Sequence, residues 1–360
     1  MPVTYKNLYR SICDFDNLLE AYSRARRGKQ QTDEMRRFHF KLEMNLWDLC
    51  AELQDGTYRL GPYRHFRIVD PKPRKISAAP FRDRIVHHAL CLVIQPLFER
   101  KFIYDSYANR IGKGTHRALD RADRWVKCYP YVLKMDILKF FPSVDHAVLE
   151  NVWRRTIACG PTLDLCGRIL AGGDGVLADE YPMQWFPGDD LLSPLGRARG
   201  LPIGNLTSQF WANVLLNELD HFVVEQLRLG PYLRYVDDFL VFGENPRDLW
   251  AARDAVADFL ARLRLSLHPR KCHVMPTARG VPFLGFRLFP THRRLSGDGL
   301  DRARRRLRRQ RLALARGELT TEAFRRSLAS WIGHTQHGDT WHLRRLLLTD
   351  RVWPVAREAI

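Results

Sequence analysis

The chain has 360 residues, and its Lys and Arg side chains outnumber Asp and Glu by 58 to 40, a formal net charge of +18. This excess predicts a polyanionic partner such as nucleic acid, although charge alone does not separate an enzyme from a basic binding protein. Seven scattered cysteines without a CxxC pair argue against a disulfide framework or a zinc module. With neither a secretory signal nor an apolar run of membrane length, we expect a soluble cytoplasmic protein without membrane contact.

Residues 1–56 are expected to form an N-terminal layer of helices. Asp16 is a candidate N-cap, and apolar residues then recur at helical spacing on one face: Phe38, Leu42, Leu46, Leu49 and Leu53. Such a stripe is typical of a packing layer. The basic run at 24–29 has two interpretations, an RNA contact or a solvated face.

Short extended segments follow at 63–69 and 74–76, and the turn between them, Asp70-Pro71-Lys72-Pro73, is basic. Further on, Arg82-Asp83-Arg84 is expected to be an ion-pair network that precedes a helix. The segment Gly112-Lys113-Gly114-Thr115 lacks the spacing of a phosphate-binding P-loop, so we interpret Thr115 as the N-cap of a helix.

Residues 160–199 are rich in Gly, Pro and Asp and are predicted to be a loose insertion. The pair Asp189-Asp190 lies among turn-forming residues without a strand around it, so we expect both side chains to be solvated. The next segment, 201–209, opens a helix that continues to Leu219. A glycine at this opening allows close approach of backbone to a nucleotide, and Ser208 can donate a hydrogen bond there.

The strongest chemical signal is a set of three carboxylates at the ends of apolar strands. Residues 131–137 are predicted to be a strand ending at Asp136, and 232–242 a hairpin whose turn is Tyr235-Val236-Asp237-Asp238. An isolated Asp-Asp turn is most often solvated, but a third carboxylate on a matching strand changes the interpretation. Paired divalent ions take such oxygen ligands and act on phosphates, so the pattern indicates phosphoryl transfer.

The last part of the chain is predicted to be helical and strongly basic. From Arg293 onward, Leu300, Ala303, Leu307 and Leu314 form one helix face, arginines occupy the remainder, and Gly317 ends the helix. A second helix is expected to begin at Thr320 or Thr321. So many cations with little acid nearby repel one another unless phosphates lie close. His334 and His337 lack further ligands, so a metal site there is not favoured.

The Tyr-Val-Asp-Asp box, Asp136 and the segment 200–209 together resemble a reverse transcriptase, with further blocks in the family's order from about residue 66 to about residue 337. Most members have Gln-Gly-x-x-x-Ser-Pro in the segment. Here Ile203 replaces the Gln and Gln209 replaces the Pro. Among bacterial members, this double departure is most similar to the diversity-generating retroelement type.

The resemblance implies an α+β fold, a right-hand polymerase with a ferredoxin-like antiparallel palm sheet, fingers and a helical thumb. We accordingly expect an N-terminal helical extension (1–56), fingers and palm (57–289) and a basic thumb (290–360). It also implies two Mg²⁺ ions, replaceable by Mn²⁺. Their ligands would be Asp136, Asp237, Asp238 and the backbone carbonyl of Ile137.

The resemblance further implies roles around the nucleotide and the primer. Lys271 would act as general acid or charge partner toward the departing pyrophosphate. Phe141 would be the steric gate against a ribose 2′-hydroxyl. The other expected nucleotide contacts are Lys72 and Arg74 at the phosphates, and Ile203, Gly204, Ser208 and Gln209 in the pocket. The primer grip would be Phe283, Leu284 and Gly285, and the nucleic-acid backbone contacts Arg110, Lys113, Arg304, Arg305 and Arg308.

The implied function is RNA-directed DNA polymerase activity with deoxynucleoside triphosphates, an RNA template and a DNA or RNA primer. A small basic accessory protein is an additional expected partner. Because Ile203 can only pack where a Gln would hydrogen-bond, discrimination against wrong nucleotides should fall by roughly 1–2 kcal/mol, which corresponds to about tenfold more misincorporation. The alternatives are another bacterial reverse transcriptase (retron, group II intron-related or phage-defence) and a non-catalytic RNA-binding scaffold.

Overall fold

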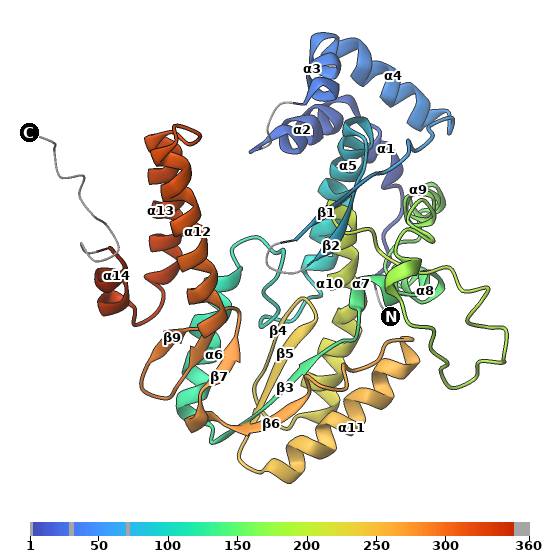
Figure 1. Cartoon of the computed structure of the whole chain (residues 1–360). Helices are drawn as coiled ribbons and strands as arrows, with labels where there is room; N and C mark the ends of the chain where they lie inside the picture. Colours follow the sequence, from blue (N-terminus) through green and yellow to red (C-terminus); the bar gives the residue numbers. More distant parts are fainter. Residues whose placement is uncertain (1–2, 29–31, 70–72, 349–360) are drawn as a thin grey trace, which may run out of the picture.

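The computed structural model describes residues 3–28, 32–69 and 73–348, which fold into helices and antiparallel sheets (Figure 1). The predicted α+β composition is confirmed. None of the described helices is long and apolar enough to cross a membrane.

The N-terminal segment forms the predicted helical layer. Its helices are α1 (Tyr9–Ile12), α2 (Phe15–Arg26), α3 (Asp33–Phe40) and α4 (Leu42–Gln54). The N-cap of α2 is Asp14 rather than the predicted Asp16, because the Asp14 carboxylate accepts the backbone N–H groups of Asp16 and Asn17. Leu18 and Ala21 of α2 are fully buried in the core that also contains residues of the long helix α5 (Phe81–Glu99). The layer therefore rests on α5, as Figure 1 shows.

A four-stranded antiparallel sheet lies at the centre, with the strand order β4-β5-β3-β6. Its strands are β3 (Tyr131–Asp136), β4 (Tyr232–Tyr235), β5 (Asp238–Gly243) and β6 (His273–Pro276). Between β3 and β4 the chain forms α7 (Phe140–Ser143), α8 (His146–Arg154), α9 (Gly160–Ala171), α10 (Leu206–His221) and the π-helical segment Phe222–Leu227. Helix α11 (Pro246–Arg262) connects β5 to β6. The connectivity is thus strand, helices, hairpin, helix, strand.

Both faces of this sheet are covered, which explains why its strands are apolar without alternation. Successive strand residues point to opposite faces. Leu133 and Val241 belong to the core that includes residues of α10 and α11, whereas Val132 and Leu240 belong to a second core. That second core includes residues of α6 (Thr115–Cys128) and of a three-stranded sheet.

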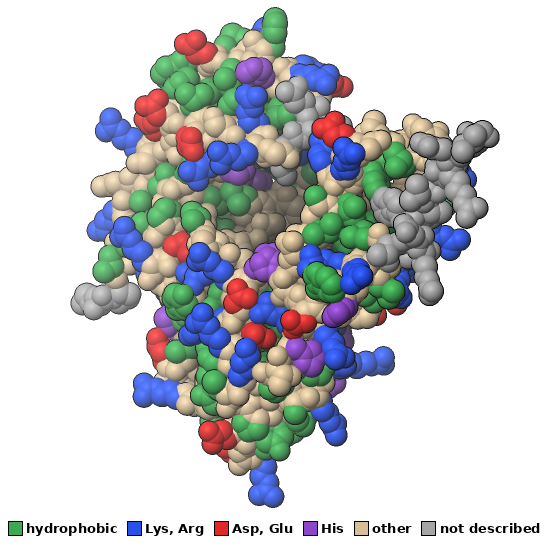
Figure 2. All heavy atoms as spheres, turned by 90° about the vertical axis from the view of Figure 1, so that its left-hand side faces the viewer, with side chains coloured by type: hydrophobic (Ala, Val, Ile, Leu, Met, Phe, Trp, Pro, Cys, Tyr) green, Lys and Arg blue, Asp and Glu red, His purple; other side chains and the backbone are tan. Residues whose placement is uncertain are grey.

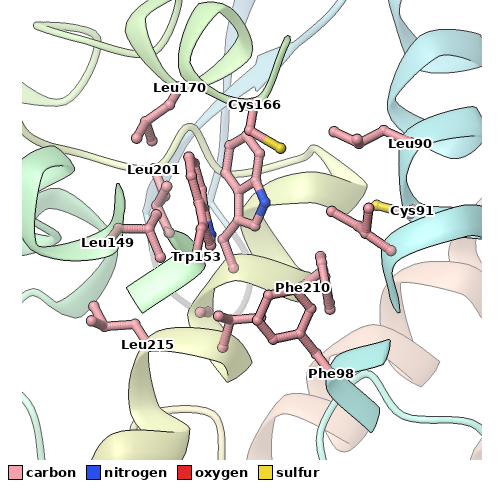
Figure 3. Close-up of a cluster of buried hydrophobic side chains, with 14 of the residues drawn as sticks. Leu90, Cys91, Phe98, Leu149, Trp153, Cys166, Leu170, Leu201, Phe210 and Leu215 are labelled. Carbon is pink, nitrogen blue, oxygen red and sulfur yellow. The ribbon is translucent and has the colours of Figure 1, made fainter. Parts of the chain in front are cut away.

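The main core is filled by aromatic and aliphatic side chains from distant parts of the chain. Trp153 of α8, labelled in Figure 3, has its ring centroid 4.8 Å from that of Trp211 of α10. Phe98 of α5 meets Phe210 edge-on at 5.6 Å. Burial of such rings excludes water over a large area and adds a favourable ring geometry. Helix α10 is therefore held from several sides, which makes it a rigid support.

Two peripheral units flank the centre. One is the hairpin of β1 (Arg64–Ile68) and β2 (Arg74–Ala78). The other begins with the sheet of β7 (Val281–Phe283), β8 (Phe286–Leu288) and β9 (Arg293–Leu295) and continues into α12 (Gly297–Ala315), α13 (Thr321–Thr335) and α14 (Trp341–Leu348). Figure 1 shows α12 and α13 as an antiparallel pair on the side of the molecule opposite α8 and α9.

The insertion is more ordered than its sequence predicts, because its first residues form helix α9 (Gly160–Ala171). Asp190 is exposed, as expected, but the Asp189 side chain is only 3% exposed and forms an ion pair with Arg197. Arg197 also lies 3.4 Å from the buried carboxylate of Asp145. The prediction of a solvated Asp189 is therefore wrong, because a cation eight residues later in the chain lies against it.

Candidate active site

A cavity of about 600 Å³ lies where the central sheet meets α7 and the start of α10. Most of the residues predicted for the metals and the nucleotide line it, together with Leu284 of the predicted primer grip: Arg74, Asp136, Ile137, Phe141, Ile203, Gly204, Ser208, Gln209, Asp237, Asp238, Lys271 and Leu284. These residues come from segments more than 200 positions apart. The fold therefore brings the separate sequence blocks to one place.

Strand pairing sets the three carboxylates beside one another. Asp136 ends β3 and lies opposite Asp238, the first residue of β5. The backbone N–H of Ile137 donates to the carbonyl of Asp237 at 3.2 Å, which ties the turn to the end of β3. Residues directly opposite in an antiparallel pair have neighbouring side chains. All three carboxylates consequently line the same cavity.

The turn that carries two of them has an unusual backbone. Tyr235 pairs with Asp238, so Val236 and Asp237 form a two-residue hairpin loop. Val236 has a φ of +56°. Tight hairpins favour glycine at such a position, and a β-branched residue is strained there. The surrounding structure must stabilise this turn.

Burial and mutual repulsion disfavour the ionised carboxylates. Burial, and then the neighbouring Asp136, raise the pKa of Asp237 to about 6. Burial also raises the pKa of Asp238, against the opposing effect of Lys134. Clusters of acids with raised pKa values are characteristic of functional sites.

Two lysines form ion pairs with the carboxylates of Asp136 and Asp238. Lys271 Nζ lies 2.8 Å from Asp136 Oδ1, and Lys134 Nζ lies 3.1 Å from Asp238 Oδ2. Lys134 also donates to the carbonyl of Pro282 at 2.9 Å. Lys271 was predicted from the sequence, whereas Lys134 was missed. Its only local signal is its position two residues before Asp136, on the same side of the strand.

The donor set fits a hard divalent cation. The Asp238 Oδ1 atom is buried and has no hydrogen-bond partner, so it is an oxygen ligand that lacks a cation. In the conformation described, Asp136 and Asp238 are turned toward their lysines. Accordingly, the described part of the chain holds no group of three His, Cys, Asp or Glu side chains already arranged around a metal ion.

The start of α10 is fastened to the β1–β2 hairpin. The Ile203 carbonyl accepts the Ser77 N–H at 2.8 Å. Gly204 has a φ of +118°, and a Cβ there would lie 2.9 Å from Ile76, so this glycine serves a close approach to β2. Asn205 accepts from the Ala79 N–H and donates to the Ser77 carbonyl at 3.0 Å. Asn205 was missed in the sequence, although Asn is a common helix-capping residue.

Two neighbouring phenylalanines differ in burial. Phe140 is 2% exposed and lies in the core. Phe141 is only partly buried and lines the cavity, with the rings 5.4 Å apart in an edge-on arrangement. On the opposite wall, Ser208 is buried and Gln209 is exposed. The residues expected to surround a nucleotide therefore face the same space.

The predicted primer-grip segment is the tight turn between β7 and β8. Phe283 pairs with Phe286, and both side chains are buried in the second core. Leu284 and Gly285 both have positive φ, as the two-residue hairpin turn of type I′ requires. Leu284 lines the cavity, whereas Phe283 and Gly285 do not belong to its lining.

The predicted backbone-binding cations fall into two groups. Arg304, Arg305 and Arg308 are exposed along α12. By contrast, the Arg110 side chain is 8% exposed, pairs with Glu99 at 2.8 Å and donates to two backbone carbonyls. Lys113 Nζ donates to the Tyr104 carbonyl at 2.6 Å and lies 3.4 Å from that ring's centroid. Both side chains therefore have partners inside the protein.

The described residues include only part of the basic turn between β1 and β2. Arg74 is exposed and lines the cavity. Lys75, the next residue, has its ammonium 3.3 Å from the carboxylate of Asp179. Lys72 lies outside the described residues.

Thr115 is the first residue of α6 rather than its N-cap, and its hydroxyl lies 3.0 Å from that of Tyr235.

Residues 69–288 match the sequence profile of the reverse transcriptase (RNA-dependent DNA polymerase) family. The chain belongs to this family. Over 296 residues this reverse transcriptase is 24% identical to Protein YkfC of Escherichia coli K12, covering 69% of the chain and 72% of YkfC. Over 186 residues it is 25% identical to the group II intron-encoded protein LtrA of Lactococcus lactis subsp. cremoris, covering 51% of the chain and 29% of LtrA.

A similar alignment exists with Nuclear intron maturase 1, mitochondrial, of Arabidopsis thaliana. The two are 23% identical over 282 residues, which is 57% of the chain and 40% of the maturase. The reverse transcriptase thus spans less than half of LtrA and of this maturase. The family match confirms the enzyme class predicted from the sequence, an RNA-directed DNA polymerase.

Proposed function

We propose that the enzyme copies RNA into DNA by nucleotidyl transfer at the cavity, with Asp136, Asp237 and Asp238 as ligands of two Mg²⁺ ions. The observation that carries this proposal is the strand register that sets Asp136 opposite Asp238, next to the Asp237 turn. When bound, such ions stabilise charge on the attacking and leaving oxygens of an in-line displacement. Mn²⁺ would occupy the same oxygen ligands.

The protein's own residues supply the remaining functions. Arg74, on the exposed wall of the cavity, would hold the triphosphate, which is the kind of fixed positive charge that phosphoryl transfer uses. Lys271 is within hydrogen-bond reach of Asp136 and would donate a proton to the departing pyrophosphate. Phe141 would exclude a ribose 2′-hydroxyl by steric overlap.

The architecture supports a right-hand polymerase. The central sheet would be a ferredoxin-like palm, since its connectivity and its strand order are those of that fold. The β1–β2 hairpin would belong to the fingers, and the basic unit from β9 to α14 would be the thumb. The division into an N-terminal extension (1–56), fingers and palm (57–289) and thumb (290–360) agrees with this proposal.

A nucleic-acid duplex would lie across the face shown in Figure 2. That face is hollowed at its middle, and Lys and Arg side chains are spread over it. The exposed Arg304, Arg305 and Arg308 of α12 would contact phosphates. Such contacts position template and primer without reading the sequence.

We further propose the diversity-generating subtype. The supporting observation is Ile203, which lines the cavity with an apolar side chain where most of the family has Gln. Copying would then be error-prone, concentrated at template adenines, and a small basic accessory protein would be a partner. The second candidate is a group II intron-related enzyme, which the similarity to LtrA favours.

Primer extension on a defined RNA with Mg²⁺, followed by sequencing of the products, tests the proposal. The wild type should extend oligo(dT) on poly(rA), and Asp237→Asn should abolish extension while template–primer binding survives. Asp190→Asn is the matched control, because Asp190 is an exposed carboxylate outside the cavity. Normal extension by Asp237→Asn would refute the metal role. Frequent errors at adenine would favour the diversity-generating subtype, and faithful copying the intron-related one.

A further inference from the structure

Behind the carboxylate turn lies a buried arginine that has no part in the reaction described above. Arg234 of β4 is 1% exposed, and Asp220 near the end of α10 is fully buried. The two form a bidentate pair, with Nε to Oδ1 at 2.7 Å and Nη2 to Oδ2 at 2.6 Å. Tyr232 also donates to Asp220, at 2.7 Å. A buried charge pair often contributes little net stability, so its presence calls for another explanation.

The remaining donors of Arg234 show what the pair holds. Nη1 donates to the carbonyl of Val236 at 3.1 Å and to Asn213 Oδ1 at 3.2 Å. Nη2 also donates to Ser106 Oγ at 3.3 Å. With these contacts, the five N–H groups of the guanidinium all have acceptors, and the planar fork has a single orientation.

Among these contacts, the hydrogen bond to the Val236 carbonyl matters for the backbone conformation of the turn. Val236 is β-branched, it has a φ of +56°, and Asp237 and Asp238 follow it directly. Strained residues persist only where their surroundings enforce them. The hydrogen bond from Arg234 to the Val236 carbonyl acts on this strained peptide from inside the protein.

We propose that the buried Arg234–Asp220 pair positions the catalytic turn against helix α10. The same helix carries Ser208 and Gln209 of the nucleotide pocket at its other end. The pair therefore sets where two metal-binding carboxylates lie relative to the nucleotide. Arg234 is a positioning residue that touches neither substrate nor metal, and the inference rests on the proposed function of the cavity.

The test separates positioning from stability. The double variant Arg234→Met/Asp220→Leu removes both charges together, a change that is often neutral or stabilising for a buried pair. We expect kcat for primer extension to fall about 100-fold, since a displacement of about 1 Å can have that effect. Template–primer Kd should change less than about threefold, because the proposed phosphate contacts of α12 lie outside the turn.

A third substitution gives the decisive comparison. Gly adopts a positive φ without strain, so Val236→Gly should recover about tenfold of the lost kcat in the double variant, and not raise it in the wild type. An equal effect of Val236→Gly in both backgrounds would overturn the proposal, as would wild-type kcat in the double variant. If the double variant does not fold, Arg234→Lys takes its place, because an ammonium keeps the charge but loses the fork.

Hydrogen–deuterium exchange provides a readout independent of activity. The amide of Ile137, which donates to Asp237, should exchange faster in Arg234→Lys than in the wild type. Arg197→Lys is the control, since Arg197 is a 4%-exposed arginine that pairs with Asp189 and Asp145 and does not line the cavity. Unchanged exchange at Ile137 would refute the positioning role. Failure of the wild type to extend any primer would refute the proposed function and leave this measurement decisive.

Discussion

Replacing Asp237 by Asn should stabilise the metal-free protein while it abolishes primer extension. Folding raises the pKa of this carboxyl from its ordinary value of 3.8 to about 6, first through burial and then through repulsion from Asp136. One pKa unit corresponds to about 1.4 kcal/mol, so the ionised carboxylate opposes folding by up to about 3 kcal/mol at pH 7. The neutral amide does not carry this cost.

The stabilising effect of Asp237→Asn should depend on pH. The folded chain binds the Asp237 proton more tightly than the unfolded chain does. This contribution to stability is therefore fully present below about pH 4 and is lost as the pH rises through about 6. The difference in unfolding free energy between Asp237→Asn and the wild type should thus grow by up to about 3 kcal/mol between pH 4 and pH 7.

Urea unfolding in EDTA across this pH range measures the difference, and titrating groups that do not interact with Asp237 cancel between the two proteins. Asp190→Asn is the control with the opposite sign, because hydrogen bonds from Ser193 lower the pKa of Asp190. That variant should lose stability at neutral pH. Mg²⁺ should stabilise the wild type and have little effect on Asp237→Asn. A difference between Asp237→Asn and the wild type that stays constant from pH 4 to pH 8 would refute the electrostatic reasoning.

Three further substitutions test other parts of the site. Lys134→Met removes the ammonium 3.1 Å from Asp238 and should lower the free energy of unfolding by about 1–3 kcal/mol in EDTA. Mg²⁺ should restore most of this stability. An equal loss with and without Mg²⁺ in urea unfolding would contradict this. Ile203→Gln should lower misincorporation at template adenines about tenfold, and an unchanged error spectrum in sequenced products would contradict the fidelity argument. Arg308→Gln should lower the slope of log Kd against log salt for template–primer by about 1, whereas an unchanged slope would place no phosphate at that side chain.

The strands that carry the three carboxylates were predictable because their signals are local. An apolar strand that ends in Asp136, and a hairpin with its carboxylates in the turn, can each be recognised within ten residues of sequence. Antiparallel pairing then brings the two ends together. The difference in burial between Phe140 and Phe141 was also predictable, because adjacent residues near a strand end face different surroundings.

The supporting contacts were not predictable, because each joins residues that are distant in the sequence. Asn205 holds Ser77 and Ala79 across more than 120 positions. Lys134 reaches Asp238 across 104 positions. Neither spacing is visible as a period or a motif.

Sequence also did not show which of the predicted backbone-binding arginines has partners inside the protein. Arg110 and Arg304 look alike in sequence, since both belong to segments where a basic residue suits a phosphate contact. In the fold, Arg110 has Glu99 and two carbonyls around it and is 8% exposed, whereas the Arg304 side chain is 49% exposed. In a chain with a net charge of +18, a cation becomes structural when the fold brings a carboxylate against it in a site without water. Neutralising Arg110 would therefore unpair a shielded carboxylate and act on folding, while neutralising Arg304 would act on the attraction for nucleic acid.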